Sequence, residues 1–153
     1  MSEIAVLFGS KSDLKYWDES KQYLEYFNLA VDLKILSAHR NPDDVKEFAS
    51  HARKNGYKVI IAAAGMAAHL AGALAANTDL PVLGVPLPGG VLDGVDALLS
   101  TVQMPAGVPV ATFAVGTAGM RNALVFSAQI LSIDDTTLAN KLSEFKKQGC
   151  RIK

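Results

Sequence analysis

Apolar residues along the chain gather in five short runs, separated by longer segments with a helical pattern. The runs are Ile4 to Phe8, Val31 to Leu36, Val59 to Ala64, Val82 to Val85 and Val108 to Val115. A mostly continuous apolar run, rather than a strictly alternating one, indicates a strand covered on both faces, as in a parallel sheet. We therefore expect five buried parallel strands.

The segments between and after these runs predict six helices. Their expected ranges are Asp13 to Phe27, Asn41 to Gly56, Ala67 to Ala76, Leu92 to Val102, Met120 to Leu131 and Thr136 to Lys147. Strands that alternate with helices through right-handed crossovers predict an α/β fold, a three-layer αβα sandwich with a flavodoxin-like parallel sheet. We expect a single α/β domain over residues 1–153, with its C-terminal helix at about 136–148.

The segment from Asn41 to Gly56 carries the clearest helix signals. Asn41 is a suitable N-cap, and Pro42 fits the first helical position. The apolar positions that follow, from Val45 to Ala52, have the spacing of one buried helix face. Gly56 then suits the left-handed residue that ends a helix.

Composition and charge exclude several classes of protein. Fifteen basic residues balance fifteen acidic ones, so no overall field points to nucleic acid or to an anionic membrane. No apolar run approaches the roughly 20 residues of a membrane span. The start of the chain lacks the features of a signal peptide, and the single cysteine, Cys150, cannot form an internal disulfide. A cytoplasmic protein is the expectation.

Three loops at the expected carboxyl ends of the strands carry the candidate chemistry, because open parallel sheets bind ligands at this edge. The first loop, Gly9 to Asp13, joins a glycine and two serines to a helix start, which suits a phosphate group. Ser12 and Asp13 can equally be helix caps alone, and Asp13 can also bind a pair of sugar hydroxyls. The glycine patterns of P-loops and dinucleotide sites are absent.

The other two loops each carry a histidine. In the second loop, His39 is a candidate for proton transfer near neutral pH, and Arg40 matches phosphate with its planar fork. Both can also be ordinary exposed loop residues. In the third loop, the sequence GMAAHLAG surrounds His69 with small residues, so that this ring either faces a pocket or is buried beside a backbone partner. His51 lies off the apolar face of its helix and is expected at the surface.

Small residues are dense between positions 62 and 76 and again between 105 and 119. Such segments allow close packing, which fits a homo-oligomer as well as the core of a monomer. The sequence leaves both possibilities open.

Four segments together resemble a known family. The segments GSKSD, SAHRNPD, AAHL and VQMPAGVPVAT, in this order, resemble the N5-carboxyaminoimidazole ribonucleotide mutases of purine biosynthesis, within the AIR carboxylase family. The resemblance runs over roughly residues 4 to 132. It implies a flavodoxin-like homo-octamer that needs no cofactor and no metal. The implied reaction moves a carboxylate from the exocyclic nitrogen of a small-molecule ribonucleotide to a ring carbon.

The family's pattern also implies roles for individual residues. It makes His39 the general acid and base, with His69 as a second candidate catalytic residue on the carboxylate side. The implied substrate-binding residues are Ser10, Ser12, Asp13, Ser37, Ala38, Arg40, Gly65 and Leu70. The chemistry agrees, because a carbamate nitrogen must gain a proton for CO2 to leave and the ring carbon must then lose one. One histidine between the two positions can do both.

The chain departs from the family's pattern at positions around the expected CO2 side of the pocket. Met66 stands where a second glycine is usual, and Ala71 where proline is usual. Pro88, Gly89 and Gly90 replace a stretch that usually contains a serine. We expect the details of carboxylate binding to differ accordingly.

Three alternative functions remain at this point. A related carboxylase makes the same product from free CO2, but that branch commonly has lysine after the histidine, so Arg40 favours the mutase. A flavin-binding module of the same fold is the second alternative, although only 7% of residues are aromatic and no loop offers a stacking pair. A phospho-receiver domain needs acidic residues at the strand ends, whereas the first strand ends at Gly9 and Ser10 and the second at Ser37.

Overall fold

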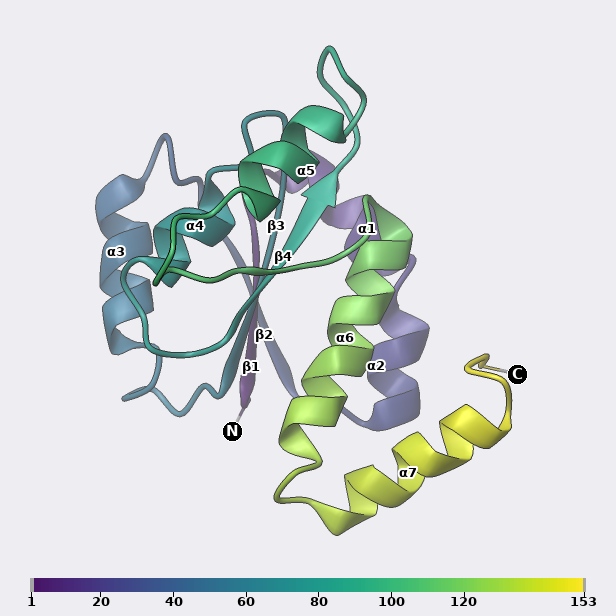
Figure 1. The fold of residues 1–153 in the computed structure, drawn as a ribbon. Coiled ribbons are helices and arrows are strands. Elements are labelled where there is room, and N and C mark those ends of the chain that lie inside the picture. The colour runs from purple at the N-terminus through teal and green to yellow at the C-terminus, as the bar shows by residue number, and fades with distance from the viewer. Residues whose placement is uncertain (1, 153) are drawn as a thin grey trace.

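The computed structural model describes residues 2–152, and its five strands form one parallel sheet (Figure 1). The strands are β1 (Ile4–Phe8), β2 (Val31–Ile35), β3 (Val59–Gly65), β4 (Val82–Leu87) and β5 (Ala111–Thr112). Their order across the sheet is β2-β1-β3-β4-β5. This is the flavodoxin order, so the predicted three-layer sandwich is confirmed.

Helices cover both faces of the sheet. One face carries α3 (Pro42–His51), α4 (Leu70–Ala75) and α5 (Val95–Val102). The other carries α1 (Leu14–Asp18), α2 (Lys21–Phe27), α6 (Thr117–Leu131) and α7 (Thr136–Lys147), as Figure 1 shows. A single turn of 3₁₀ helix, η1 (Lys11–Asp13), precedes α1.

The central strand β1 shows why the sheet is buried on both sides. Ile4, Val6 and Phe8 point toward α1, α2, α6 and α7, while Ala5 and Leu7 point toward α3 and α4. All five side chains are fully buried. Burial of each large side chain is worth about 1.5–3 kcal/mol, so the sheet anchors the loops that follow its strands.

The first predicted helix is interrupted, which the apolar pattern did not indicate. α1 ends at Asp18 and α2 begins at Lys21. At the break, the buried Ser20 hydroxyl donates a hydrogen bond of 2.7 Å to the carbonyl of Tyr16. A serine that bonds back to the preceding turn competes with the helical ladder and bends the chain.

The fifth strand is much shorter than the predicted range from Val108 to Val115. Only Ala111 and Thr112 pair in register, with Leu83 and Gly84 of β4. Pro109 has no backbone N–H, and Val108 bonds back to the carbonyl of Pro105 in a turn. Because of these features, pairing with β4 begins only at Ala111, and β5 is a short edge strand.

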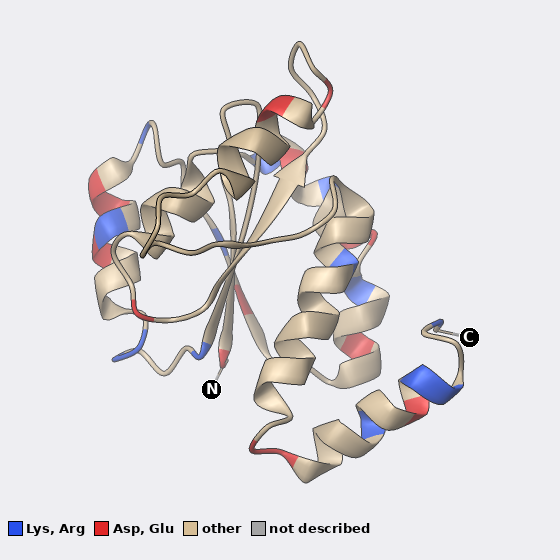
Figure 2. Ribbon diagram, viewed as in Figure 1, with Lys and Arg blue, Asp and Glu red and all other residues tan. Residues whose placement is uncertain are grey.

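Charge is unevenly distributed over the fold. Between Lys58 and Arg121 the chain carries only three charged residues, Asp79, Asp93 and Asp96. Figure 2 accordingly shows Lys, Arg, Asp and Glu on α3, α2 and α7, whereas α4 carries none. In the part of the chain that the structure describes, no helix is long and apolar enough to span a membrane.

Candidate functional site

A cavity of about 500 Å³ opens at the carboxyl ends of β1, β2 and β3. This is the point where the strand order reverses, between β1 and β3, and open α/β sheets bind ligands there. The cavity brings together all ten residues that the sequence predicted for the site: Ser10, Ser12, Asp13, Ser37, Ala38, His39, Arg40, Gly65, His69 and Leu70.

The first loop supplies hydroxyl groups and a carboxylate. Ser10, rather than Ser12 or Asp13, is the residue whose side chain caps the helical turn, because its Oγ accepts the Ser12 N–H at 3.3 Å. The two serine hydroxyls lie 2.8 Å apart. Burial raises the pKa of the Asp13 carboxyl, while the Ser12 hydroxyl and the charge of Lys15 oppose the shift. Because Asp13 makes no cap hydrogen bond, its carboxylate is available to a ligand.

The second loop presents His39 and Arg40 on a tight turn. The Ser37 hydroxyl accepts the Arg40 N–H at 3.3 Å, and the Ser37 carbonyl accepts the Asn41 N–H at 2.7 Å. Ala38 is buried beneath this turn, so both His39 and Arg40 face outward. Asn41 occupies the predicted N-cap position of α3, but its side chain makes no cap hydrogen bond.

The Arg40 guanidinium is available for an anion. The ion pairs formed by residues 2–152 join Lys21 to Asp18, Lys34 to Asp32, Arg53 to Asp79 and Lys58 to Glu3. Arg40 takes part in none of them. A planar cation without a protein partner at the mouth of a cavity suits a phosphate or a carboxylate.

The third loop explains why α4 begins at Leu70 and not at the predicted Ala67. Met66 and Ala68 have positive φ angles of 55° and 23°, which interrupt a right-handed helix. The turn closes with a 3.0 Å hydrogen bond from the Ala68 N–H to the Gly65 carbonyl. The next residue, His69, faces the cavity, so the alternative of a buried histidine is wrong.

The two histidines of the cavity stack on each other. The ring centroids of His39 and His69 are 5.1 Å apart, and the ring planes differ by 15°. The sequence placed both histidines at the same sheet edge, but nothing in it indicated this contact. His51 is exposed on α3, as predicted, and lies outside the cavity.

The loop after β4 closes the far side of the cavity with Pro88, Gly89 and Gly90. The positive φ angles of 117° at Gly89 and 72° at Gly90 suit glycine at both positions. Met66 also lines the cavity, so most departures from the family's pattern do surround it. Ala71 is the exception, because it is buried within α4 and does not line the cavity.

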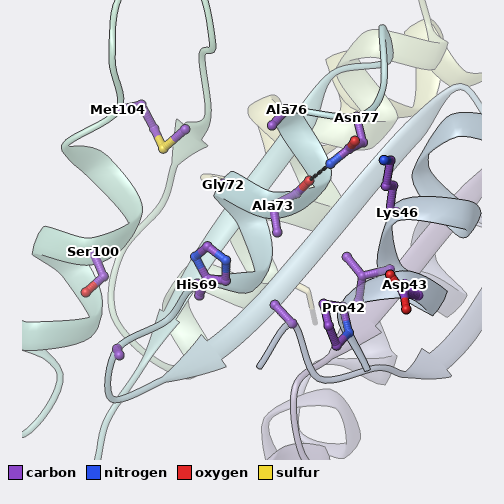
Figure 3. Close-up of a pocket in the computed structure, with 13 residues that line it drawn as sticks. Pro42, Asp43, Lys46, His69, Gly72, Ala73, Ala76, Asn77, Ser100 and Met104 are labelled. Atoms are coloured by element: carbon purple, nitrogen blue, oxygen red, sulfur yellow. Dashed lines mark hydrogen bonds between the residues drawn. The ribbon is translucent and has the colours of Figure 1, made fainter. Parts of the chain in front are cut away.

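A second cavity of about 690 Å³ lies between α3, α4 and the end of α5, and it was not predicted (Figure 3). It shares Ala38, Ala67 and His69 with the first cavity. Met104, just after α5, lines this second cavity.

The fold and the cavity together define a flavodoxin-like αβα protein with a candidate small-molecule site at its topological switch point. Two imidazoles, one guanidinium, three hydroxyls and one carboxylate converge there. Such a set can bind a phosphorylated ligand and transfer protons to it. Across residues 2–152, no three His, Cys, Asp or Glu side chains gather as metal ligands would.

Comparison with known proteins identifies the family. The model of the AIR carboxylase family matches residues 3–151, and the chain belongs to this family. The predicted family is therefore confirmed.

Named relatives are similar over nearly the whole chain. The N5-carboxyaminoimidazole ribonucleotide mutase of Haemophilus influenzae is 51% identical, covering 95% of this chain and 89% of the relative. The protein of the same name from Bacillus subtilis is 50% identical, covering 92% and 87%. A third, from Saccharolobus solfataricus, is 46% identical, covering 96% and 92%.

A solved structure shows the same fold. The crystal structure of Treponema denticola PurE superposes with a TM-score of 0.84 and 23% sequence identity, covering 96% of this chain and 90% of that one. None of these comparisons favours a flavin-binding module or a phospho-receiver domain.

Proposed function

We propose that the protein is an N5-carboxyaminoimidazole ribonucleotide mutase, an isomerase of de novo purine biosynthesis. Relatives of that name are 46–51% identical to the chain over nearly its whole length. The observation that carries the proposal is the convergence of His39, Arg40 and the hydroxyl-rich first loop on one cavity at the switch point. These groups match a phosphorylated substrate that must exchange protons.

The cavity offers a place for each part of the substrate. Arg40 has no ion-pair partner among residues 2–152 and provides a planar fork for the phosphate. The hydroxyls of Ser10 and Ser12 lie in the same cavity and donate further hydrogen bonds. Asp13, whose carboxylate makes no cap bond, accepts hydrogen bonds from the ribose hydroxyls. This arrangement directs the imidazole base of the substrate toward His39.

The reaction needs one proton transfer in each of two successive steps. In the first step, protonated His39 gives its proton to the exocyclic nitrogen as the bond to the carboxylate breaks and CO2 is released. In the second step, the ring carbon attacks CO2 and forms the new carbon–carbon bond. The proton on that carbon then passes to the neutral imidazole, which restores the aromatic ring and returns His39 to its starting state. No oxidant, reductant or phosphoryl donor enters this balance.

The small residues of the third loop allow the substrate to pack closely. Gly65, Ala67 and Ala68 line the cavity with little side-chain volume, so the substrate can lie against the backbone. Close packing there excludes water and keeps CO2 beside the ring carbon between the two steps. Correct placement of reacting groups contributes about 7 kcal/mol or more to such reactions.

A comparison of two substrates tests the proposal. Purified protein should convert the carbamate, N5-carboxyaminoimidazole ribonucleotide, to the 4-carboxy product without added bicarbonate. Under the same conditions, 5-aminoimidazole ribonucleotide with bicarbonate should react much more slowly. Faster turnover of the second pair would contradict the proposal and favour a carboxylase that uses free CO2.

We further propose that the chain works as a cytoplasmic homo-octamer, as its resemblance to the family implies. Val91, Leu92, Val95, Leu99 and Val102 form an apolar surface along and before α5 and are 46–95% exposed. The surrounding part of the chain carries few charges, which supports burial of this surface against further copies. Light scattering should give a mass near eight times 16.2 kDa, and a monomeric mass would contradict the proposal.

A further inference from the structure

The stacked histidines differ in how firmly the protein holds them. His69 immediately precedes α4, whose side chains Leu70, Ala71 and Leu74 are at most 3% exposed. His39 lies on the exposed turn between β2 and α3. The ring of His69 is therefore attached to a packed helix, whereas the ring of His39 projects from a loop.

Within residues 2–152, the stack on His69 is the one aromatic contact of the His39 ring. Among the side-chain hydrogen bonds formed within residues 2–152, the only imidazole involved is that of His51. The nitrogens of His39 and His69 are therefore left to solvent or to a ligand. The centroid distance of 5.1 Å and the angle of 15° lie within the range of favourable stacking.

His69 also borders the second cavity. It lines the second cavity as well as the first, and Figure 3 shows it between α3, with Pro42 and Asp43, and α5 with the loop after it, with Ser100 and Met104. The ring is thus part of the wall between two cavities. Its backbone is placed by the packed start of α4, and its ring is open to both cavities.

We propose that His69 is a positioning residue, whose ring holds the His39 imidazole by stacking in the orientation that reaches both ends of the migrating carboxylate. This inference rests on the proposed function and adds to it a division of roles between the two histidines. His39 transfers the proton. His69 supplies a flat surface, and its nitrogens are not required.

Three substitutions separate the ring of His69 from its nitrogens. His69→Phe keeps a flat ring without nitrogen, His69→Gln keeps a polar amide without a ring, and His69→Ala removes both. We expect His69→Ala and His69→Gln to lower kcat about 10- to 100-fold, the effect of misplacing a reacting group, with KM changed less than about threefold. His69→Phe should keep kcat within about threefold of the wild type.

Three outcomes of this assay would overturn the inference. If His69→Gln kept its activity while His69→Phe lost it, the nitrogen would be the essential feature. Equal loss in all three variants would likewise assign proton chemistry to His69. Unchanged kcat in all three would show that the stack has no role. His51→Ala, at the exposed histidine of α3, is the matched control and should leave both constants unchanged.

A second measurement does not depend on turnover. The chain has three histidines, so ¹³C-labelled histidine gives few ring signals, and His39→Asn identifies those of residue 39. In the ligand-free protein, the ring current of His69 should shift the His39 signals. His69→Ala and His69→Gln should remove that shift, whereas His69→Phe should still show a ring-current shift. If the wild type had no mutase activity, the proposed function would fail, while these signals would still test the stack. Identical His39 signals in wild type and His69→Ala would overturn the inference.

Discussion

At Gly119, in the first turn of α6, the helix lies close to the backbone of the loop that precedes it. A Cβ atom at this position would overlap the Ala114 carbonyl oxygen and lie 3.1 Å from Cγ1 of Val85 in β4. The oxygen belongs to the backbone and cannot rotate away. Gly119→Ala therefore requires a shift of α6 or of the backbone that precedes it.

The size of this effect follows from two opposing contributions. Overpacking of a well-packed interior costs up to about 3 kcal/mol, and a clash with the backbone belongs at that end of the range. Replacing glycine by alanine within a helix returns about 1 kcal/mol. We expect Gly119→Ala to lower the free energy of unfolding by about 2 kcal/mol or more, which corresponds to a decrease in Tm of roughly 4–8 °C.

Gly72→Ala in α4 is the matched control, because it makes the same chemical change within a helix. Its new Cβ would meet Sδ and Cε of Met104 at 3.2 and 3.4 Å, the end of a flexible side chain that can move. We expect unchanged stability or a gain of up to about 1 kcal/mol. Denaturant unfolding of wild type and both variants at one protein concentration measures the difference. A loss below about 0.5 kcal/mol for Gly119→Ala, or equal losses at both sites, would refute the steric reasoning.

Three further predictions concern the candidate site and an ionisable group outside it. His39→Asn should retain the fold and ribonucleotide binding while kcat falls about 100-fold or more; near-wild-type turnover would contradict its role in proton transfer, and His51→Asn is the control. Arg40→Ala should raise KM by roughly 10- to 100-fold, because a charge-assisted hydrogen bond to phosphate is lost. Arg53→Ala, which removes an exposed ion pair in the turn after α3, should leave KM unchanged. Burial, together with a hydrogen bond to a neighbouring carboxylate, raises the pKa of Tyr57 from 10.0 to about 12. Between these two pKa values, the folded protein keeps a proton that the unfolded chain loses. The contribution of Tyr57 to the free energy of unfolding is therefore complete below pH 10 and is lost as the pH rises toward 12. Tyr57→Phe should therefore make unfolding stability less steeply dependent on alkaline pH, and equal slopes for variant and wild type would count against this shift.

The elements that the sequence predicted best are those in which local and tertiary signals agree. β1 is apolar at every position and is buried on both faces. For α3, the proline at the first helical position led to the correct start, whereas the helix ends at His51, before the predicted Gly56. The loops that follow β1, β2 and β3 were placed at one edge because parallel strands all end there.

The features that the sequence did not predict depend on contacts between distant residues or on single backbone angles. The break at Ser20 arises because one hydroxyl bonds to the preceding turn, which apolar spacing does not register. The late start of α4 depends on positive φ angles at Met66 and Ala68, two residues for which such angles are uncommon. The histidine stack requires two side-chain orientations from loops 30 positions apart, and the second cavity requires the packing of three helices.

The candidate active site draws very unequally on the two halves of the chain. Of the residues that line the 500 Å³ cavity, only Pro88, Gly89 and Gly90 come from beyond position 70. The groups assigned to proton transfer and nucleotide binding can therefore stay fixed while this short tripeptide varies. It follows that a mutant library confined to these three codons would remodel one wall of the chamber and leave the imidazoles, the guanidinium and the hydroxyls as they are.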